Sequence, residues 1–168
     1  MEHHIQDIGS VVRQEKLEEF IIFGFSRGVS YALGFALKNS SKVRGLILGD
    51  YPAVHTKLAD QWVEWFINLP PWKGKTALKR MKRYAIERIQ KESSEKEFWH
   101  ELSTLECPVL VIRGGKQGAI LSDELCQKYK ESLTNVKTIC FEDSDHNLFQ
   151  PNLESFTQTV NTFTGQIT

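Results

Sequence analysis

The sequence has no net charge, no long apolar run, no internal repeat and no low-complexity tract. Its 168 residues carry 21 basic and 21 acidic side chains, so charge gives no overall attraction to nucleic acid or to an acidic surface. No apolar run approaches membrane-spanning length, and the first residues are polar, unlike a signal peptide. These absences predict a chain with no nucleic-acid partner and no stable membrane insertion.

Cysteine is scarce. The chain has three cysteines: Cys107, Cys126 and Cys140. Their number is odd and their spacing is not that of metal ligands. We therefore expect reduced thiols in a cytoplasmic protein and no metal site. The chain is long enough for one sizeable core and short for two complete domains.

Apolar runs alternate with helical patterns, which is typical of an α/β fold whose parallel sheet of about four strands has helices on both faces. The strands are expected at 20–25, 43–48, 108–112 and 136–141, and the helices at 5–17, 29–36 and 122–133 and from Pro151 onward. The first helix would bury a stripe that includes Val11 and Leu17. The last would bury Leu153, Phe156, Val160 and Phe163.

Residues 55–104 interrupt this alternation with two helical patterns and no strand candidate. We interpret them as a helical lid inserted into a core made of residues 1–54 and 105–168, near the sheet edge where α/β proteins bind ligands. The second pattern spans 78–89 in a stretch, 73–91, with eight basic residues and one acidic residue. A solvated lid face is the preferred interpretation, and binding of an anionic membrane or nucleic acid is the alternative.

The pattern Gly24-Phe25-Ser26-Arg27-Gly28 lies between the first strand and its helix. A serine at such a turn has a strained backbone, and a Cβ at Gly24 or Gly28 is expected to collide with the adjoining strand or helix. The helix that follows directs its N-terminus at Ser26, which favours developing negative charge there.

His146 lies in the last strand-to-helix loop, where a parallel sheet brings it to the same edge as Ser26. With Leu46-Ile47-Leu48-Gly49-Asp50, residues 105–114 and the loop Asp145-His146-Asn147-Leu148-Phe149, the chain resembles the C-terminal two thirds of the α/β-hydrolase fold superfamily. The resemblance implies that Ser26 is the nucleophile and His146 the base, and that no metal or organic cofactor takes part.

The third member of the triad stays open. The family's usual position, after the third predicted strand, reads Gly115-Lys116-Gln117-Gly118-Ala119 and has no carboxylate. Asp50, at the position that some relatives use, is the first choice. The alternatives are Asp123, which resembles a helix-capping acid, a local acid such as Asp143, and a site without a carboxylate.

The first four strands of the family have no counterpart, nor does the loop that lends a second oxyanion donor; only the backbone N–H of Arg27 is predicted for that role. A fragment, a late start and recruitment of the missing half elsewhere all fit this pattern. The strand 20–25 would then lie at an open edge without proline, lysine or bulge, which predicts a homo-oligomer formed through that edge.

The sequence therefore predicts a serine hydrolase that acts on a small-molecule carboxylic ester or related acyl compound. Epoxide and haloalkane chemistry in this fold generally uses aspartate at the position of Ser26, which argues against both. The apolar side chains of Trp62, Trp65, Phe66 and Trp72 would line an acyl pocket or, as helical spacing favours, pack within the lid. Two other functions stay open: a weak or inactive relative that works by association, and anionic-surface binding through the basic helix.

Overall fold

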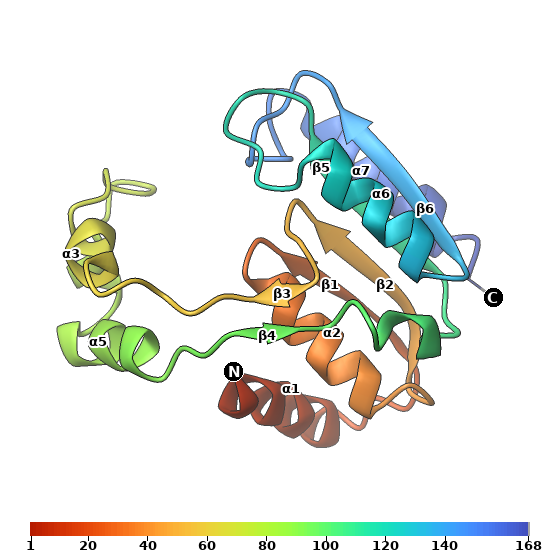
Figure 1. Ribbon diagram of the computed structural model, residues 1–168, viewed down its shortest axis with the longest axis horizontal. Coiled ribbons are helices and arrows are strands. Elements are labelled where there is room, and N and C mark those ends of the chain that lie inside the picture. Colours follow the sequence, from red (N-terminus) through yellow and green to blue (C-terminus); the bar gives the residue numbers. More distant parts are fainter. Residues whose placement is uncertain (168) are drawn as a thin grey trace. The chain divides into compact units, whose positions relative to one another are not determined.

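The computed structural model describes residues 1–167, and a parallel four-stranded sheet is its central element (Figure 1). The strands run in the order β1-β2-β5-β6, and all three pairings are parallel. Their bounds are Phe20–Phe25 for β1, Val43–Gly49 for β2, Val109–Gly114 for β5 and Val136–Phe141 for β6. The predicted α/β fold is confirmed, and β1 lies at one edge of the sheet.

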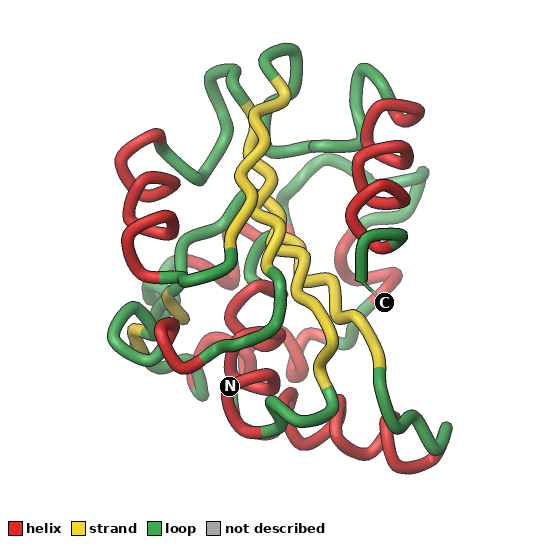
Figure 2. Tube along the Cα trace, turned by 90° about the vertical axis from the view of Figure 1, so that its right-hand side faces the viewer, coloured by secondary structure: helices red, strands yellow, loops and turns green. Residues whose placement is uncertain are grey.

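Helices cover both faces of this sheet (Figure 2). On one face lie α2 (Gly28–Lys38) and α6 (Asp123–Ser132), with α1 (Glu2–Gln14) packed on α2; on the other lies α7 (Leu153–Thr164). In α7, Phe156 and Phe163 pack against Ile47 of β2 and against Leu110 and Ile112 of β5. Such continuous burial explains why the central strands are uninterrupted apolar runs.

The register places three loops side by side at the carboxyl edge of the sheet. Phe25 pairs with Gly49, and Gly49 pairs with Ile112, so β1, β2 and β5 end at the same level. The residues that follow these strands therefore lie close together, although they are far apart in the sequence.

The chain divides into two compact units. The smaller, called the insertion unit below, comprises His55–Lys96 together with Met1; the larger comprises the remaining described residues. The insertion unit spans 55–96, whereas the lid expected from the sequence spans 55–104; Phe98 and Leu102 of the segment 97–104 are fully buried and belong to the larger unit. That segment includes the short 3-10 helix η1 (Leu102–Thr104).

Two short strands form a second sheet in a region where no strand was predicted. They are β3 (Val54–His55) and β4 (Lys96–Glu97), at the points where the chain leaves and re-enters the larger unit. Next to them, the N–H of Phe98 donates to the carbonyl of Ala53 at 2.9 Å. Two-residue strands leave no detectable alternation in a sequence.

The insertion unit contains α3 (Trp62–Ile67), α4 (Ala77–Arg80) and α5 (Arg83–Lys91). The expectation of one helix over 78–89 is wrong, because Met81 and Lys82 have extended backbones between α4 and α5. Ala77 and Ile86 are both buried. On one continuous helix they would lie about two and a half turns apart, on opposite faces, and the break allows both to be buried.

Two helix ends also differ from expectation. α1 ends at Gln14 and leaves Val11 and Leu17 exposed. α7 begins at Leu153, where the Asn152 side chain caps it by accepting from the N–H of Ser155 at 3.0 Å, and Leu153 is exposed. Within residues 1–167, none of the helices combines the length and the apolar character that crossing a bilayer requires.

Candidate active site

Ser26 occupies a strained turn between β1 and α2. Its φ of 54° lies in the left-handed region, which a residue with a side chain rarely adopts. The turn is held on both sides, because Ser26 N–H donates to the carbonyl of Gly49 and the Ser26 carbonyl accepts from Val29 N–H, each at 2.9 Å. The Ser26 hydroxyl is thus presented at the N-terminus of α2.

The two glycines of the turn are not equivalent. A Cβ on Gly24 would lie 2.7 Å from the Gly28 carbonyl oxygen and 2.8 Å from Val29 Cα, so this glycine is required for close packing of β1 on α2. A Cβ on Gly28 would meet nothing within 4 Å. The expectation that Gly28 also avoids a collision is therefore wrong, because the first residue of α2 points its side-chain position into open space.

His146 lies within hydrogen-bond distance of Ser26, with its Nε2 2.9 Å from Ser26 Oγ. Its loop is fixed against the loop after β5: the Ser144 carbonyl accepts from Lys116 N–H at 2.9 Å, and Gly114 leaves no space for a Cβ beneath the Asp145 carbonyl. Leu148 is buried in the core two residues later. These contacts hold the imidazole at the carboxyl edge of the sheet.

Asp50 holds the other side of the imidazole. Its Oδ2 is 2.7 Å from His146 Nδ1, and the carboxylate also accepts from the backbone N–H groups of Ile120 at 2.9 Å, Leu121 at 3.2 Å and Gly114 at 3.3 Å. Asp50 is 0% exposed and has a left-handed φ of 45°. Every contact of the carboxylate is thus a donor.

These contacts determine the charge of Asp50. Burial alone would raise its pKa, because a buried carboxyl favours the neutral form. The hydrogen bonds from His146 and from the three backbone N–H groups outweigh burial and hold the pKa of Asp50 below its ordinary value. The carboxylate is therefore ionised at neutral pH.

The other carboxylates considered from the sequence lie elsewhere. Asp123 pairs with Arg113, and Asp143 lies 3.7 Å from Lys116. The structure thus brings Ser26, His146 and Asp50 into one hydrogen-bonded row, with Asp50 as the acid that contacts the imidazole.

Sequence reasoning missed two supports of this row. The first is the end of β5 and the loop after it, which has no carboxylate at Gly115–Ala119 and supplies the backbone donors Gly114, Ile120 and Leu121 to Asp50. The second is the Phe25 ring, which stacks on the His146 imidazole with centroids 4.9 Å apart and an interplanar angle of 23°. Phe149 packs against Phe25 in turn, at 5.3 Å. The position of Phe25 beside Ser26 in the turn was the available signal.

Arg27, the predicted oxyanion donor, directly follows Ser26 at the N-terminus of α2. Its side chain runs along the helix, where Nε donates to the Tyr31 hydroxyl at 3.3 Å, and the Tyr31 ring packs against His4 of α1 at 4.7 Å. The backbone N–H of Arg27 is therefore the group to consider at the reacting atoms, and its role stays a prediction.

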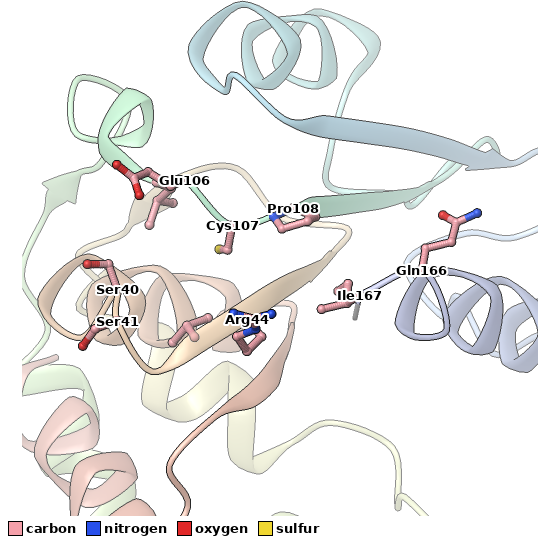
Figure 3. Close-up of a pocket in the computed structure, with 10 residues that line it drawn as sticks. Ser40, Ser41, Arg44, Glu106, Cys107, Pro108, Gln166 and Ile167 are labelled. Carbon is pink, nitrogen blue, oxygen red and sulfur yellow. The ribbon is translucent and has the colours of Figure 1, made fainter.

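A pocket of about 540 Å³ lies at the opposite end of the strands (Figure 3). It is lined at the start of β2 by Arg44 and ahead of β5 by Cys107 and Pro108. Burial raises the pKa of the Cys107 thiol, which keeps it protonated. This pocket is separate from Ser26 and offers no activated nucleophile.

The aromatic residues considered for an acyl pocket divide into two groups. Trp62 and Phe66 stack on each other, with centroids 4.9 Å apart, whereas Trp65 and Trp72 are exposed. Packing within the insertion unit thus accounts for the first pair. The part of the chain that the structure describes contains no cluster of three or more potential metal ligands.

Comparison with known proteins shows similarity in structure alone, since no family model and no curated protein matches the sequence. MGS-M2, an alpha/beta hydrolase enzyme from a Medee basin deep-sea metagenome library, superposes with a TM-score of 0.75 at 15% identity, covering 98% of this chain and 71% of that one. The meta-cleavage product hydrolase of Pseudomonas fluorescens IP01 gives 0.71 at 15% identity, with the same coverage of 98% and 71%.

A third neighbour is an esterase from Exiguobacterium antarcticum, with a TM-score of 0.67 at 18% identity, covering 95% of this chain and 71% of the esterase. All three neighbours are hydrolases, and each is longer than the region it shares with this chain. The chain has the α/β-hydrolase fold over a length equal to 71% of these proteins.

Proposed function

We propose that this chain is a serine hydrolase of the α/β-hydrolase type, acting on a carboxylic ester or a related acyl compound. The observation that carries the proposal is the hydrogen-bonded row in which His146 lies 2.9 Å from Ser26 Oγ and 2.7 Å from Asp50 Oδ2. The strained φ of Ser26 supports it, since such strain is found where a side chain must be presented for chemistry.

In this mechanism the Ser26 hydroxyl attacks the substrate carbonyl carbon while His146 Nε2 takes its proton. Asp50 accepts the Nδ1–H bond, which fixes the tautomer that leaves Nε2 free to act as base, and stabilises the imidazolium that forms. His146 then protonates the leaving group, and an acyl group stays on Ser26. Water, deprotonated by the same imidazole, releases the acid.

The oxyanion is stabilised by the backbone N–H of Arg27 and by the N-terminus of α2. Removing one donor from such a hole raises the barrier by about 3 kcal/mol, which is on the order of a hundredfold in rate. A site with the Arg27 donor alone is therefore expected to be slower by about this factor than a site with two donors. If the chain is instead a catalytically weak relative, an activity assay would show slow turnover.

Covalent labelling tests the assignment without requiring a known substrate. A fluorophosphonate probe is expected to modify the parent at one site, to fail with Ser26→Ala, and to react about a thousandfold more slowly with His146→Ala. Ser30→Ala, which changes a buried serine on α2, serves as a control for nonspecific serine labelling. Unchanged labelling of Ser26→Ala would exclude Ser26 as the nucleophile.

The insertion unit is proposed to act as the lid of this enzyme, selecting among acyl substrates. Replacing residues 57–94 by a short Gly/Ser linker is expected to retain labelling by the small probe and to alter the relative rates on short-chain and long-chain nitrophenyl esters. Unaltered relative rates would contradict the lid role.

The edge of β1 is proposed to pair with a second copy of the chain. Within residues 1–167, β1 pairs with β2 and has no second neighbour, and Phe23 on this edge strand is 42% exposed. Sedimentation at micromolar concentration is expected to show a dimer or larger species that Phe23→Lys dissociates, whereas Val11→Lys, at an exposed apolar position on α1, leaves it intact. A monomeric parent would contradict this association.

A cytoplasmic location is proposed as well, supported by three cysteines that form no disulfide in the structure. Fractionation of the source cells would test it. Recovery of the protein outside the cytoplasmic fraction would contradict the proposal.

A further inference from the structure

Exposed aromatic and aliphatic side chains are concentrated in the insertion unit. Trp72 is 59% exposed, and Trp65, Leu78 and Tyr84 are also exposed. Single exposed apolar side chains are ordinary on protein surfaces, but several within a short segment indicate a surface that contacts something other than water. Because these exposed apolar side chains lie in one unit, we expect this unit to contact a partner.

The chain holds Trp72 in a tight turn at this surface. Trp72 and Lys75 exchange two backbone hydrogen bonds of 3.1 Å, and Lys73 and Gly74 between them have φ of 49° and 73°. Two successive left-handed residues form a rigid two-residue turn. Trp72 is therefore displayed on a fixed projection, because Pro70 and Pro71 also stiffen the chain ahead of it.

Two cationic side chains lie over the Trp72 ring. Lys73 Nζ lies 4.7 Å from the ring centroid and Arg80 Cζ lies 5.6 Å from it. A pocket of about 370 Å³, lined by Leu69, Pro70, Trp72 and Arg80, opens at the same place. An apolar surface with basic groups at its rim matches a ligand that is apolar inside and anionic at its boundary.

The positive charge of this region is local and largely unpaired. Within 73–91, Arg83 forms ion pairs with Glu64 and Glu87, and Arg88 pairs with Glu92. The other basic side chains are exposed and form no ion pair with any residue in 1–167; they are Lys73, Lys75, Lys79, Arg80, Lys82 and Lys91. The whole chain is neutral, so this stretch differs in charge from the rest of the molecule.

We propose that the turn at Trp72 and the basic residues after it adsorb peripherally to an anionic phospholipid bilayer. The lysines contact headgroup phosphates, and Trp72, with Leu69 of the pocket beside it, enters the boundary between headgroups and acyl chains. An aliphatic side chain and an apolar pocket beside the tryptophan favour lipid over nucleic acid, which would offer bases for stacking but no aliphatic phase. Unlike the solvated-face interpretation, the proposal accounts for the exposed apolar side chains.

Vesicle binding tests the proposal with the full chain in a Ser26→Ala background, so that the result does not depend on hydrolysis. The protein is expected to co-sediment with vesicles of phosphatidylcholine and phosphatidylglycerol in equal amounts, but not with phosphatidylcholine alone. Binding should weaken as salt rises from about 0.1 M to about 1 M, because screening shortens the reach of the lysines. Tryptophan emission should shift to shorter wavelength on binding, and Trp72→Ala should abolish most of the shift.

Charge reversal locates the surface. The double variant Lys75→Glu/Lys79→Glu is expected to bind the mixed vesicles at least about tenfold more weakly than the parent. The matched control Lys42→Glu/Lys137→Glu makes the same charge change at exposed positions of the larger unit and should bind like the parent. Circular dichroism establishes that each variant is folded.

Three results would overturn the proposal. One is parental binding by the folded Lys75→Glu/Lys79→Glu variant, and another is equal loss in the control, which would mean that binding follows net charge alone. The third is displacement from the mixed vesicles by single-stranded RNA combined with an unshifted tryptophan spectrum, which would assign the surface to nucleic acid.

Discussion

Replacing Asp50 by asparagine tests the proposed triad most directly, because every contact of its carboxylate comes from a donor. Oδ2 faces His146 Nδ1 and Ile120 N–H, and Oδ1 faces Gly114 N–H and Leu121 N–H. Asparagine has one acceptor oxygen and one NH₂ group. Whichever way its amide is placed, the NH₂ group opposes two of these groups.

The two placements fail differently. With NH₂ towards His146, the imidazole must accept at Nδ1 and carry its proton on Nε2, so it no longer accepts the Ser26 proton; loss of this tautomer costs about 10⁴-fold in rate. With NH₂ towards Gly114 and Leu121, two buried backbone donors lose their acceptor, at about 1–3 kcal/mol each. We expect the labelling rate of Ser26 to fall by about a thousandfold or more, and the free energy of unfolding by about 2 kcal/mol, roughly 4–8 °C in Tm.

The assay compares second-order labelling rates and thermal unfolding of Asp50→Asn, Asp123→Asn and the parent. Asp123 has an 87% exposed side chain and pairs with Arg113, so its change should alter the labelling rate less than about twofold. A folded Asp50→Asn variant that labels at the parent rate would refute the role of Asp50 and the tautomer argument together.

Three further predictions follow from contacts in the larger unit. Gly24→Ala is expected to lower the free energy of unfolding by about 2–3 kcal/mol, because its Cβ would meet backbone atoms, while Gly28→Ala stays within about 1 kcal/mol of the parent. Denaturant titration measures both variants, and equal free energies of unfolding would contradict the close packing at Gly24. Phe25→Leu should slow labelling of Ser26 by about tenfold while Phe25→Tyr retains the rate, since only an aromatic ring stacks on His146, and equal rates would exclude a positioning role. Because the pKa of Asp50 is lower in the folded protein than in the unfolded chain, its contribution to stability is present above about pH 4 and is lost as the pH falls through the folded pKa; unfolding of Asp50→Asn followed from neutral to acidic pH should show a shallower decline than the parent.

The sequence predicted the helices and strands in which buried apolar residues follow a regular pattern along the chain. The strands β2 and β5 are uninterrupted apolar runs, and α2 is apolar over most of its length, so both kinds of element were recognisable without tertiary information. The two-residue strands β3 and β4 and the break at Met81 were not, because each depends on packing between residues that are distant in sequence. The surroundings of Gly28 and Leu153 could not be predicted either, because the sequence does not reveal which direction the first residue of a helix faces.

The candidate site divides in the same way. Ser26 could be singled out because its turn requires a local pattern, and His146 because its loop follows the last strand. The choice among Asp50, Asp123 and Asp143 depended on where backbone donors converge, and backbone N–H groups carry no sequence signature. The carboxylate gap at Gly115–Ala119 was visible in the sequence, but the donors supplied by Ile120 and Leu121 were not.

The loop after β5 both lacks a carboxylate at Gly115–Ala119 and donates two N–H groups to Asp50. Here Gly114 at the end of β5 and Ile120 and Leu121 of the loop direct their N–H groups towards an acid that follows the neighbouring strand β2. The register makes this exchange possible, because Gly49 pairs with Ile112 and so brings Asp50 level with the start of the loop. Residues 115–118 of the loop are exposed, so the loop reaches the buried Asp50 through the backbone N–H groups of Ile120 and Leu121 rather than through a side chain. The stretch Gly115–Ala119 therefore needs no acid of its own for the imidazole of His146 to have a carboxylate partner, because Asp50 is that partner and the loop supplies donors to it.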